Sequence, residues 1–310
     1  MRIVTDAHIP FVTEAVRREW PDVNICPLKP EQIDAAALRN AEVLIVRTRT
    51  KVNEALLTGT AVRLVCTATI GYDHIDTAYC EAHNIRWAAC PGCNAQAVCD
   101  YIEEALKEYS DTKTLGVVGV GHVGSLVAKM AERLGMDVML NDPPKRIGVS
   151  LDEIAHNCDV ITFHVPLTGA QADFPTYHMC DEAFLHKCQP GALIINAARG
   201  GVVDEQALLR SGHPYILDTW EQEPDIDGEV LQHAFRASMH IAGYSAQGKR
   251  NASQACLDTV AAAYGLPRIV LPEAAPQGAD TAPGWLARIT TTLQAQPTAF
   301  ETLRRSYALR

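Results

Sequence analysis

Short apolar runs alternate with helical patterns along the first 94 residues of the chain. Each run ends in a turn signal or enters a helix candidate, and the runs cover residues 2–5, 23–26, 41–46 and 62–68. Strands that alternate with helices are typical of a parallel sheet whose strands are joined by crossover connections. We therefore predict an α/β domain in this part of the chain.

A clear amphipathic helix is predicted next. Its apolar side chains recur at steps of three and four residues, with charged residues between them, at Val98, Tyr101, Ile102, Ala105, Leu106 and Tyr109. Such a helix would serve as a stiff connection between two domains.

A second series of strand and helix patterns follows. Strands are predicted within residues 114–120, 137–141, 159–167, 192–201 and 215–220. Gly135 has the position of a helix stop, and Ser150 with Glu153 has capping-box spacing. Ligands of open parallel sheets bind beyond the carboxyl ends of the strands, so the loops after these strands are where chemistry is expected. Prolines and glycines in residues 265–297 predict irregular structure, followed by a last helix in residues 298–310.

Composition and length narrow the class of protein. A chain of 310 residues suggests about two domains, at roughly 150 residues each. Hydrophobic residues make up 47% and charged residues 21%, as in ordinary soluble globular proteins. The formal net charge of −10 disfavours nucleic acid and anionic membranes as partners. Ten cysteines without a signal peptide or membrane span indicate reduced thiols in a cytoplasmic protein.

A glycine-rich segment, Gly119-Val-Gly-His-Val-Gly124, fits the dinucleotide-binding fingerprint, because it follows a predicted strand and opens a predicted helix. The first glycine would make the tight turn, the second would admit the pyrophosphate, and the third would let the helix pack on the strand. Asp142 ends the next strand, where it could accept hydrogen bonds from the adenosine ribose and so favour NAD. Lys145 and Arg146 follow closely and leave NADP open.

Three further residues carry candidate chemistry. Arg199 follows an apolar strand, where a guanidinium can hold a carboxylate by two parallel hydrogen bonds, although a surface arginine is equally consistent. A carboxylate such as Glu223 beside an imidazole such as His240 would give an acid/base group that works near neutrality. With eleven histidines in the chain, the sequence alone gives His240 no special status.

Two shorter motifs have competing explanations. If the chain stays extended after residue 46, Arg47, Arg49 and Lys51 share one side and could bind a phosphate, but a solvated basic loop fits as well. Cys90-Pro-Gly-Cys93 has redox or metal spacing. No second pair follows at zinc-site distance, so structural cysteines are favoured and no metal is expected.

Taken together, these pieces resemble the D-isomer-specific 2-hydroxyacid dehydrogenases, in which an Arg, a Glu and a His follow the nucleotide-binding fold in that order. The resemblance extends from residue 1 to about residue 265 and includes features of a member with a phosphorylated substrate. The matching stretches are Arg47–Glu54, Thr67–Asp76, Cys90–Ala95, Val118–Gly124, Asp142–Pro144, Asn196–Gly200 and His240–Lys249.

The resemblance implies a fold and a domain arrangement. It implies an α/β protein of two Rossmann-like or flavodoxin-like doubly wound parallel-sheet domains with a cleft between them, plus a short C-terminal appendage. Residues 1–94 with 250–265 would form the substrate-binding domain, and residues 95–249 the NAD-binding domain. Residues 266–310 would be a linker and a dimerisation segment shorter than the family member usually carries. A homodimer is expected.

The resemblance also implies a role for each matching residue. The catalytic set would be Arg199, Glu223 and His240. The substrate contacts would be Thr48, Thr69 and Tyr244, joined by the basic residues Arg47, Arg49 and Lys51. The NAD contacts would be Gly119, Gly121, His122, Val123, Gly124, Asp142, Val165, Asp218 and Gly243.

The predicted activity is NAD-dependent oxidation of a small phosphorylated 2-hydroxy acid. One alternative is a dehydrogenase for another 2-hydroxy acid, such as 3-phosphoglycerate or an unphosphorylated acid. A different class of function is a non-catalytic NAD(H)-binding sensor on the same fold, although a sensor has no need of the Arg, Glu and His set.

Overall fold

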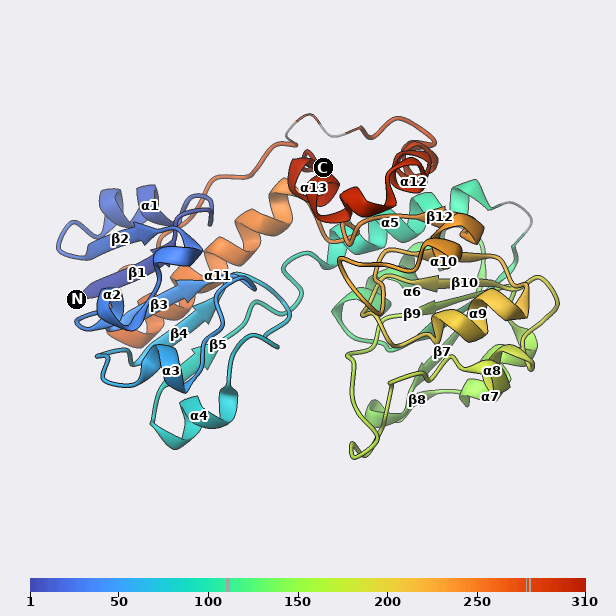
Figure 1. Cartoon of the computed structure of the whole chain (residues 1–310), viewed down its shortest axis with the longest axis horizontal. Coiled ribbons are helices and arrows are strands. Elements are labelled where there is room, and N and C mark those ends of the chain that lie inside the picture. Colours follow the sequence, from blue (N-terminus) through green and yellow to red (C-terminus); the bar gives the residue numbers. More distant parts are fainter. Residues whose placement is uncertain (110–111, 277, 279) are drawn as a thin grey trace. The chain divides into compact units, whose positions relative to one another are not determined.

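The computed structural model describes residues 1–109, 112–276, 278 and 280–310. The chain divides into two compact units (Figure 1). The first unit comprises residues 1–94 and 245–276, and the second comprises residues 95–244 and 277–310. The predicted α/β fold with two parallel-sheet domains is confirmed.

The first unit is built on a five-stranded parallel sheet in the order β2-β1-β3-β4-β5. Its strands are β1 (Arg2–Asp6), β2 (Asn24–Leu28), β3 (Val43–Val46), β4 (Leu64–Thr67) and β5 (Arg86–Ala88). Its helices are α1 (Val12–Glu19), α2 (Ala35–Leu38), α3 (Glu54–Leu57), α4 (Thr77–Ala82) and α11 (Ala246–Tyr264), with a 3₁₀ turn η1 (Pro30–Gln32). The three-residue strand β5 is too short to show an alternation, so the sequence did not predict it.

Both faces of the first sheet are covered, because alternate residues of each strand point to opposite sides. Ile3 and Ile45 belong to the apolar cluster that α1 and α11 complete, and α11 contributes Leu257 to it. Val4 and Leu44 belong to the opposite cluster, to which α2, α3 and α4 contribute. Helix α11, orange in Figure 1, therefore completes the first unit although it is distant in sequence.

The second unit is built on a seven-stranded sheet in the order β12-β11-β10-β9-β6-β7-β8. Its strands are β6 (Thr114–Val118), β7 (Asp137–Asp142), β8 (Ile147–Gly148), β9 (Val160–Phe163), β10 (Leu193–Asn196), β11 (Tyr215–Leu217) and β12 (Arg236–Ala237). All pairs are parallel except β7 with β8. Strands β7 and β9 flank β6, so the strand order reverses there, and ligands of such sheets bind at that point.

Two helix boundaries of the second unit lie at signals predicted from the sequence. The helices of this unit are α5 (Ala95–Glu108), α6 (His122–Arg133), α7 (Leu151–Asn157), α8 (Glu182–Leu185), α9 (Glu205–Ser211), α10 (Gly228–His233), α12 (Trp285–Ala295) and α13 (Phe300–Ser306), with 3₁₀ turns η2 (Pro143–Lys145) and η3 (Pro297–Ala299). Gly135 follows α6 with a φ of 81°, as predicted for a helix stop. The capping box of Ser150 and Glu153 is present at the start of α7.

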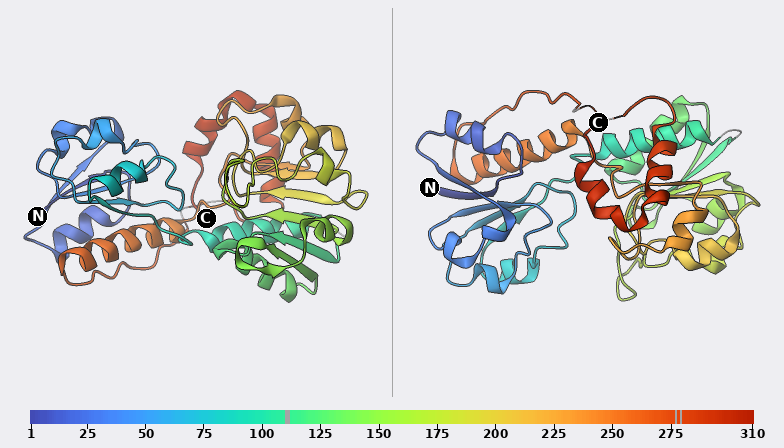
Figure 2. Two further views of the ribbon diagram at one scale, coloured as in Figure 1. Left: turned by 90° about the horizontal axis from the view of Figure 1, so that it is seen from below. Right: turned by 45° about the horizontal axis from the view of Figure 1, so that its top comes forward.

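The C-terminal residues differ from the expectation of an irregular linker. The prediction of irregular structure throughout residues 265–297 is wrong for α12, whose Trp285, Leu286 and Leu293 are buried in the core of the second unit. The Thr290 hydroxyl bonds both the amide and the carbonyl of Ala237 at the end of β12, at 2.9 and 3.1 Å. Both views of Figure 2 show α12 and α13, in red, beside the second unit. Prolines stand on both sides of α12 and mask its apolar spacing in the sequence.

The division into units also differs from the expectation that residues 266–310 form a separate segment. Residues 266–276 belong to the first unit and residues 277–310 to the second. Within the described part of the chain, no helix combines the length and apolar character needed to cross a membrane.

Candidate active site

The glycine-rich loop at the end of β6 is held by close backbone contacts. Gly119 has a φ of 91°, and a Cβ there would lie 2.6 Å from the carbonyl oxygen of His164. A Cβ at Gly124 would lie 1.9 Å from the carbonyl oxygen of Gly119. Both positions therefore require glycine for the protein's own packing.

Gly121 is different, because the protein leaves the space beside it open. A Cβ at this position would have no atom within 4 Å, and its φ of −86° suits any residue. Gly121 is the N-cap of α6, whose first N–H groups and positive dipole end favour an anion. The packing of the protein gives no reason for glycine here, whereas close approach of a pyrophosphate would.

Asp142 lies at the carboxyl end of β7 and fixes the glycine-rich loop. Its carboxylate accepts the backbone N–H of Val120 at 2.8 Å and that of Lys145 at 3.3 Å. The Lys145 ammonium is 3.4 Å from the same carboxylate and donates to the Val120 carbonyl. The structure therefore brings Asp142 to the fingerprint loop, and its role in NAD binding stays a prediction.

The other predicted cofactor residues surround the same loop or lie farther along the sheet edge. Val165 packs against Gly119: a Cβ added to Gly119 would lie only 2.8 Å from Cγ1 of Val165. His122 is exposed at the first position of α6, and Val123 packs on the core. Gly243 is half-buried in the turn after His240.

His240 and Glu223, which are predicted to act as an acid/base pair, lie in hydrogen-bond contact. The imidazole Nδ1 is 2.8 Å from Oε2 and 3.0 Å from Oε1 of the Glu223 carboxylate. An ionised carboxylate can only accept, so Nδ1 carries the proton and Nε2 is left to exchange one with a ligand. The His240 side chain is 31% exposed, which leaves room for such an exchange.

Glu223 is kept ionised by its surroundings. Burial raises the pKa of this carboxyl, but the hydrogen bond and charge of His240, the Trp220 backbone N–H and the charge of Arg304 outweigh burial, so the pKa is lowered. The Trp220 N–H donates to Oε1 at 3.0 Å. An ionised partner holds the imidazole in one orientation and stabilises its protonated form.

The turn that carries His240 is fixed by Asp218. His240 has a φ of 57°, a left-handed conformation that costs about 1–3 kcal/mol for such a residue. The buried Asp218 carboxylate accepts the N–H groups of Ile241 and Ala242 at 2.7 and 2.9 Å and the Ser238 hydroxyl at 2.6 Å. Asp218 is predicted to contact NAD. In the structure its carboxylate is hydrogen-bonded to groups of the protein itself, and it positions the His240 turn.

Arg310 binds the same turn from the other side. Its guanidinium donates to the carbonyl groups of Ile241 and Ala242, at 3.3 and 2.6 Å, and lies over the Trp285 ring at 4.5 Å. The two residues after His240 therefore have their N–H groups on a carboxylate and their carbonyls on a guanidinium. No motif in the sequence indicated this role of Arg310.

Arg199 lies in the loop after β10. The Asn196 side chain shapes this loop by bonding the Arg199 carbonyl at 2.9 Å and the Ala198 N–H at 3.1 Å. A Cβ at Gly200 would lie 1.8 Å from the Trp220 carbonyl oxygen, so the Arg199 loop packs directly on the loop that carries Glu223. The structure thus brings the loops of all three predicted catalytic residues to the carboxyl edge of one sheet.

In the first unit, the basic stretch after β3 does not remain extended. The Thr50 N–H bonds the Arg47 carbonyl at 3.2 Å, which makes residues 47–50 a turn. The prediction that Arg47, Arg49 and Lys51 share one side of an extended chain is therefore wrong. Arg47 instead makes an ion pair with the buried carboxylate of Asp6, at 2.7 Å, at the end of β1. Burial raises the pKa of Asp6, but bonds from Arg47 and His8 outweigh it and lower the pKa.

The predicted substrate contacts are spread over both units. Thr48, Arg49 and Lys51 are exposed beyond β3, whereas Tyr244 is half-buried in the second unit. Thr69 follows β4, and its hydroxyl is 2.6 Å from that of Thr67, which is 3.0 Å from Nε2 of His74. Burial lowers the pKa of His74, which favours the neutral imidazole.

Lys249 adds a cation that the sequence prediction did not include. It lies on α11 near Arg47, and desolvation followed by the Arg47 charge lowers its pKa. Two cations this close repel each other, and a bound anion would reduce that repulsion. Only the folded chain brings α11 to the carboxyl edge of β3, so no local pattern could have found this pair.

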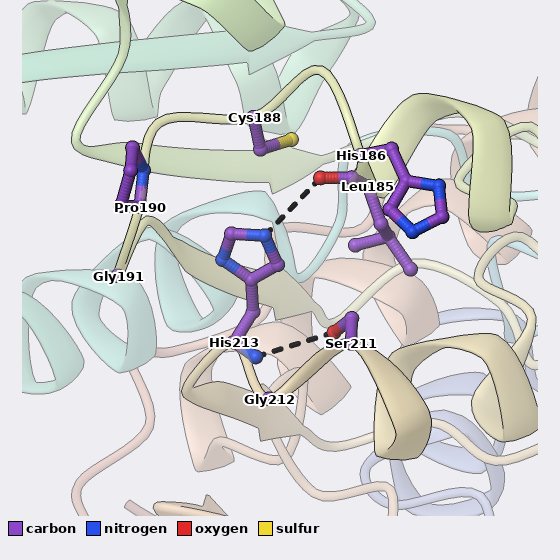
Figure 3. Close-up of a pocket in the computed structure, with 8 residues that line it drawn as sticks. All are labelled: Leu185, His186, Cys188, Pro190, Gly191, Ser211, Gly212 and His213. Carbon is purple, nitrogen blue, oxygen red and sulfur yellow. Dashed lines mark hydrogen bonds between the residues drawn. The ribbon is translucent and has the colours of Figure 1, made fainter.

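One measurable pocket lies elsewhere. It has a volume of about 330 Å³ and contains none of the predicted site residues; its lining residues are Leu185, His186, Cys188, Pro190, Gly191, Ser211, Gly212 and His213 (Figure 3). They precede β10 and β11, so the pocket lies at the amino ends of these strands, opposite the loops of the candidate site. The two ring nitrogens of His213 face the carbonyls of Ala192 and Leu185, both at 3.2 Å, which indicates a structural role.

The cysteine motif takes part in packing of the first unit. The Cys90 thiol is buried 3.8 Å from that of Cys256 on α11 and also contacts the Thr67 carbonyl. Among the described residues, no group of three or more His, Cys, Asp or Glu side chains is arranged to hold a metal.

Residues 98–252 match the NAD-binding domain of the D-isomer specific 2-hydroxyacid dehydrogenases. Curated relatives match over nearly the whole chain, so the chain belongs to this family. The cofactor is NAD.

Two of these relatives carry the same name. Erythronate-4-phosphate dehydrogenase of Bacteroides fragilis is 40% identical over 339 aligned residues, which cover 100% of this chain and 97% of the relative. The enzyme of the same name from Pseudomonas fluorescens is 37% identical, with 99% of this chain and 83% of the relative covered.

Solved structures support the family assignment. D-lactate dehydrogenase from Aquifex aeolicus, complexed with NAD and lactic acid, superposes with a TM-score of 0.68 at 26% identity over 86% of this chain and 96% of that one. NAD⁺-bound 3-phosphoglycerate dehydrogenase from Entamoeba histolytica gives a TM-score of 0.70 at 25% identity, over 88% and 99%.

The open space at Gly121 leads to a prediction about a matched pair of variants. G121A should keep the native melting temperature and weaken NADH binding by at least about tenfold, because the methyl group fills space that only the ligand needs. G124A should lower the melting temperature, because its methyl group overlaps the Gly119 carbonyl. Thermal unfolding and NADH fluorescence titration distinguish the two effects. Unchanged NADH affinity in G121A would contradict the assignment.

Glu205 gives a second prediction, on pH. It begins α9, is 6% exposed, and accepts the Glu221 N–H at 2.7 Å. Burial raises its pKa to about 7, and the charges of Glu221, Asp227 and Glu223 add to the increase, against the lowering effect of the Glu221 N–H. A raised carboxyl pKa means that stability present below pH 4.5 is lost as the pH rises through about 7.

E205Q should therefore gain stability relative to the native protein as the pH rises. The difference in free energy of unfolding should grow by roughly 2 kcal/mol between pH 5 and pH 8, because glutamine has no proton to lose. Urea unfolding at both pH values measures it. The control is E182Q at the first position of α8, where the side chain is 65% exposed and no such growth is expected. A pH-independent difference for E205Q would refute the prediction.

Proposed function

We propose that this chain catalyses the NAD-dependent oxidation of 4-phospho-D-erythronate to 2-oxo-3-hydroxy-4-phosphobutanoate, a step of vitamin B6 biosynthesis. The observation that carries the proposal is the Glu223–His240 pair, held in a fixed turn at the same sheet edge as the dinucleotide loop. The name shared by the curated relatives supplies the substrate.

Oxidation of a 2-hydroxy acid removes a hydride from C2 and a proton from its hydroxyl group. NAD, when bound, accepts the hydride. The Nε2 atom of His240 takes the hydroxyl proton as the carbonyl forms, and Glu223 stabilises the resulting imidazolium. Arg199 orients the substrate carboxylate by two parallel hydrogen bonds, which fixes C2 for transfer.

The phosphate is assigned to cations of the first unit. Lys249 lies on α11 close to Arg47 and is assigned a direct contact with the phosphate, with Arg49 and Lys51 alongside. A phosphate dianion would relieve the unfavourable effect of Arg47 and Lys249 on each other. Thr48, Thr69 and Tyr244 are assigned to the remaining substrate groups.

Two finer properties belong to the same proposal. We infer a homodimer and a cytoplasmic location, both supported by the resemblance to the family. Light scattering of the purified protein tests the dimer, and the mass of a monomer would contradict it.

The activity is tested by the appearance of NADH when the purified protein meets NAD and 4-phospho-D-erythronate, with erythronate and 3-phosphoglycerate in parallel. The 2-oxo acid product is trapped, so that an unfavourable equilibrium does not hide turnover. We expect turnover of phosphoerythronate, only weak turnover of erythronate and none of 3-phosphoglycerate. Turnover of 3-phosphoglycerate instead would retain the mechanism and reject the substrate. If none of the three acids is turned over and NADH still binds, the result would favour the NAD(H)-binding sensor.

His240 gives the sharpest variant. H240N should reduce kcat by about 10²–10⁴-fold, because it removes the proton acceptor, while NADH affinity stays nearly native. Stopped turnover assays and NADH titration measure both. An equal loss of NADH binding would show that His240 is structural.

The phosphate assignment is tested separately. K249Q should raise KM for phosphoerythronate by about tenfold or more and leave the weak turnover of erythronate nearly unchanged, since only the phosphate contact is lost. Steady-state kinetics with both acids measure this selectivity. A preference for the phosphorylated acid that survives K249Q would exclude Lys249 from the phosphate contact.

A further inference from the structure

The helix α13 brings a second cation to the Glu223–His240 pair. Arg304 lies on this helix, and its Nη1 atom is 4.0 Å from Oε2 of Glu223, the same oxygen that His240 approaches at 2.8 Å. Its guanidinium also lies over the Tyr244 ring, with Cζ 5.6 Å from the ring centre. A single carboxylate is therefore shared by an imidazole and a guanidinium.

Arg304 is held in place by the packing of the C-terminal residues. Phe300, at the start of α13, is buried in the core of the second unit, and Arg310 is bound to the turn after His240. Glu301, one turn before Arg304, is 3.8 Å from the same guanidinium. The Nε atom of Arg304 is buried and has no hydrogen-bond partner among the described residues, so this part of the guanidinium is shielded from water.

We propose that Arg304 is a positioning residue of the acid/base pair, which shares the Glu223 carboxylate with His240 and thereby limits how tightly that carboxylate holds the protonated imidazole. This inference rests on the proposed function of Glu223 and His240. It extends the site to a helix that lies outside the segment matched by the family model, which ends at residue 252.

Electrostatics gives the direction of the effect. Among the described residues, the charges that lower the pKa of Glu223 are those of His240, from the turn after β12, and Arg304, from α13. Two further carboxylates lie near this group: Glu205 from α9, whose pKa Glu223 helps to raise, and Glu301, 3.8 Å from Arg304. A cation beside Glu223 weakens its attraction for a second cation, the imidazolium. Without Arg304 the pair would keep its proton to higher pH, and fewer molecules would have a free base at neutrality.

The chain offers a matched control for Arg304. Arg305 is the next residue of the same helix, carries the same charge, and is paired with Glu301 at 2.9 Å. Its side chain is 61% exposed, against 26% for Arg304. R305Q therefore removes one positive charge from α13 without touching Glu223.

The experiment compares the pH dependence of kcat/KM for phosphoerythronate oxidation in the native protein, R304Q, R304K and R305Q. R304Q should move the acidic limb of the profile to higher pH by about half to one pH unit. R304K should restore most of the native profile, and the profile of R305Q should match that of the native protein. NADH affinity should stay native in all four. A profile of R304Q that superposes on the native one would overturn the proposal, as would an equal shift in R305Q.

A substrate-free measurement separates this inference from the proposed function. The titration of the His240 ring is followed by NMR in protein with labelled histidines. The His240 signal is assigned as the one that disappears in H240N. The same upward shift is expected in R304Q and not in R305Q, whether or not the protein turns over any hydroxy acid. Native turnover with an unshifted titration would reject the role of Arg304 alone. If R304Q fails to fold, a native titration in R304M rejects it and a shifted one supports it.

Discussion

The buried carboxylate of Asp218 is the group on which the candidate site depends. It accepts the N–H groups of Ile241 and Ala242, and the backbone carbonyl of the same residue accepts the N–H of His240. A left-handed backbone at His240 is unfavourable by itself and persists because these bonds determine it. The imidazole can then meet Glu223 with one ring nitrogen and keep the other for a ligand.

Asp218 is in turn supported by residues from distant parts of the chain. Ser238 donates to it at 2.6 Å, and the Tyr101 hydroxyl of α5 is 2.8 Å from that of Ser238. Arg310 holds the carbonyls of the same turn. A charge buried at this depth is tolerated only when it is fully hydrogen-bonded, so these partners act as one unit. The described C-terminal residues are therefore part of the site.

The two units show different uses of charge. In the second unit, opposite charges are paired closely, which fixes the orientation of the imidazole. In the first unit, Arg47 is satisfied by Asp6, and Lys249 lies near Arg47 with a lowered pKa. The first arrangement suits a group that must exchange a proton repeatedly. The second places two cations close together, which is the arrangement assigned above to the substrate phosphate.

The sequence by itself determined the fold class, the glycine-rich loop, the helix signals at Gly135 and Ser150, and the order of Arg199, Glu223 and His240. These are local features, because hydrophobic period, turn chemistry and motif spacing are all written within a few residues. Only the tertiary structure decided that Arg47 turns to Asp6 and that Asp218 faces the His240 turn. It also placed Lys249 near Arg47 in the first unit, and Arg304 near Glu223 and Arg310 on the His240 turn in the second. Each of these contacts joins residues about 20 to 200 positions apart, so it depends on how the sheets and helices pack rather than on any local pattern.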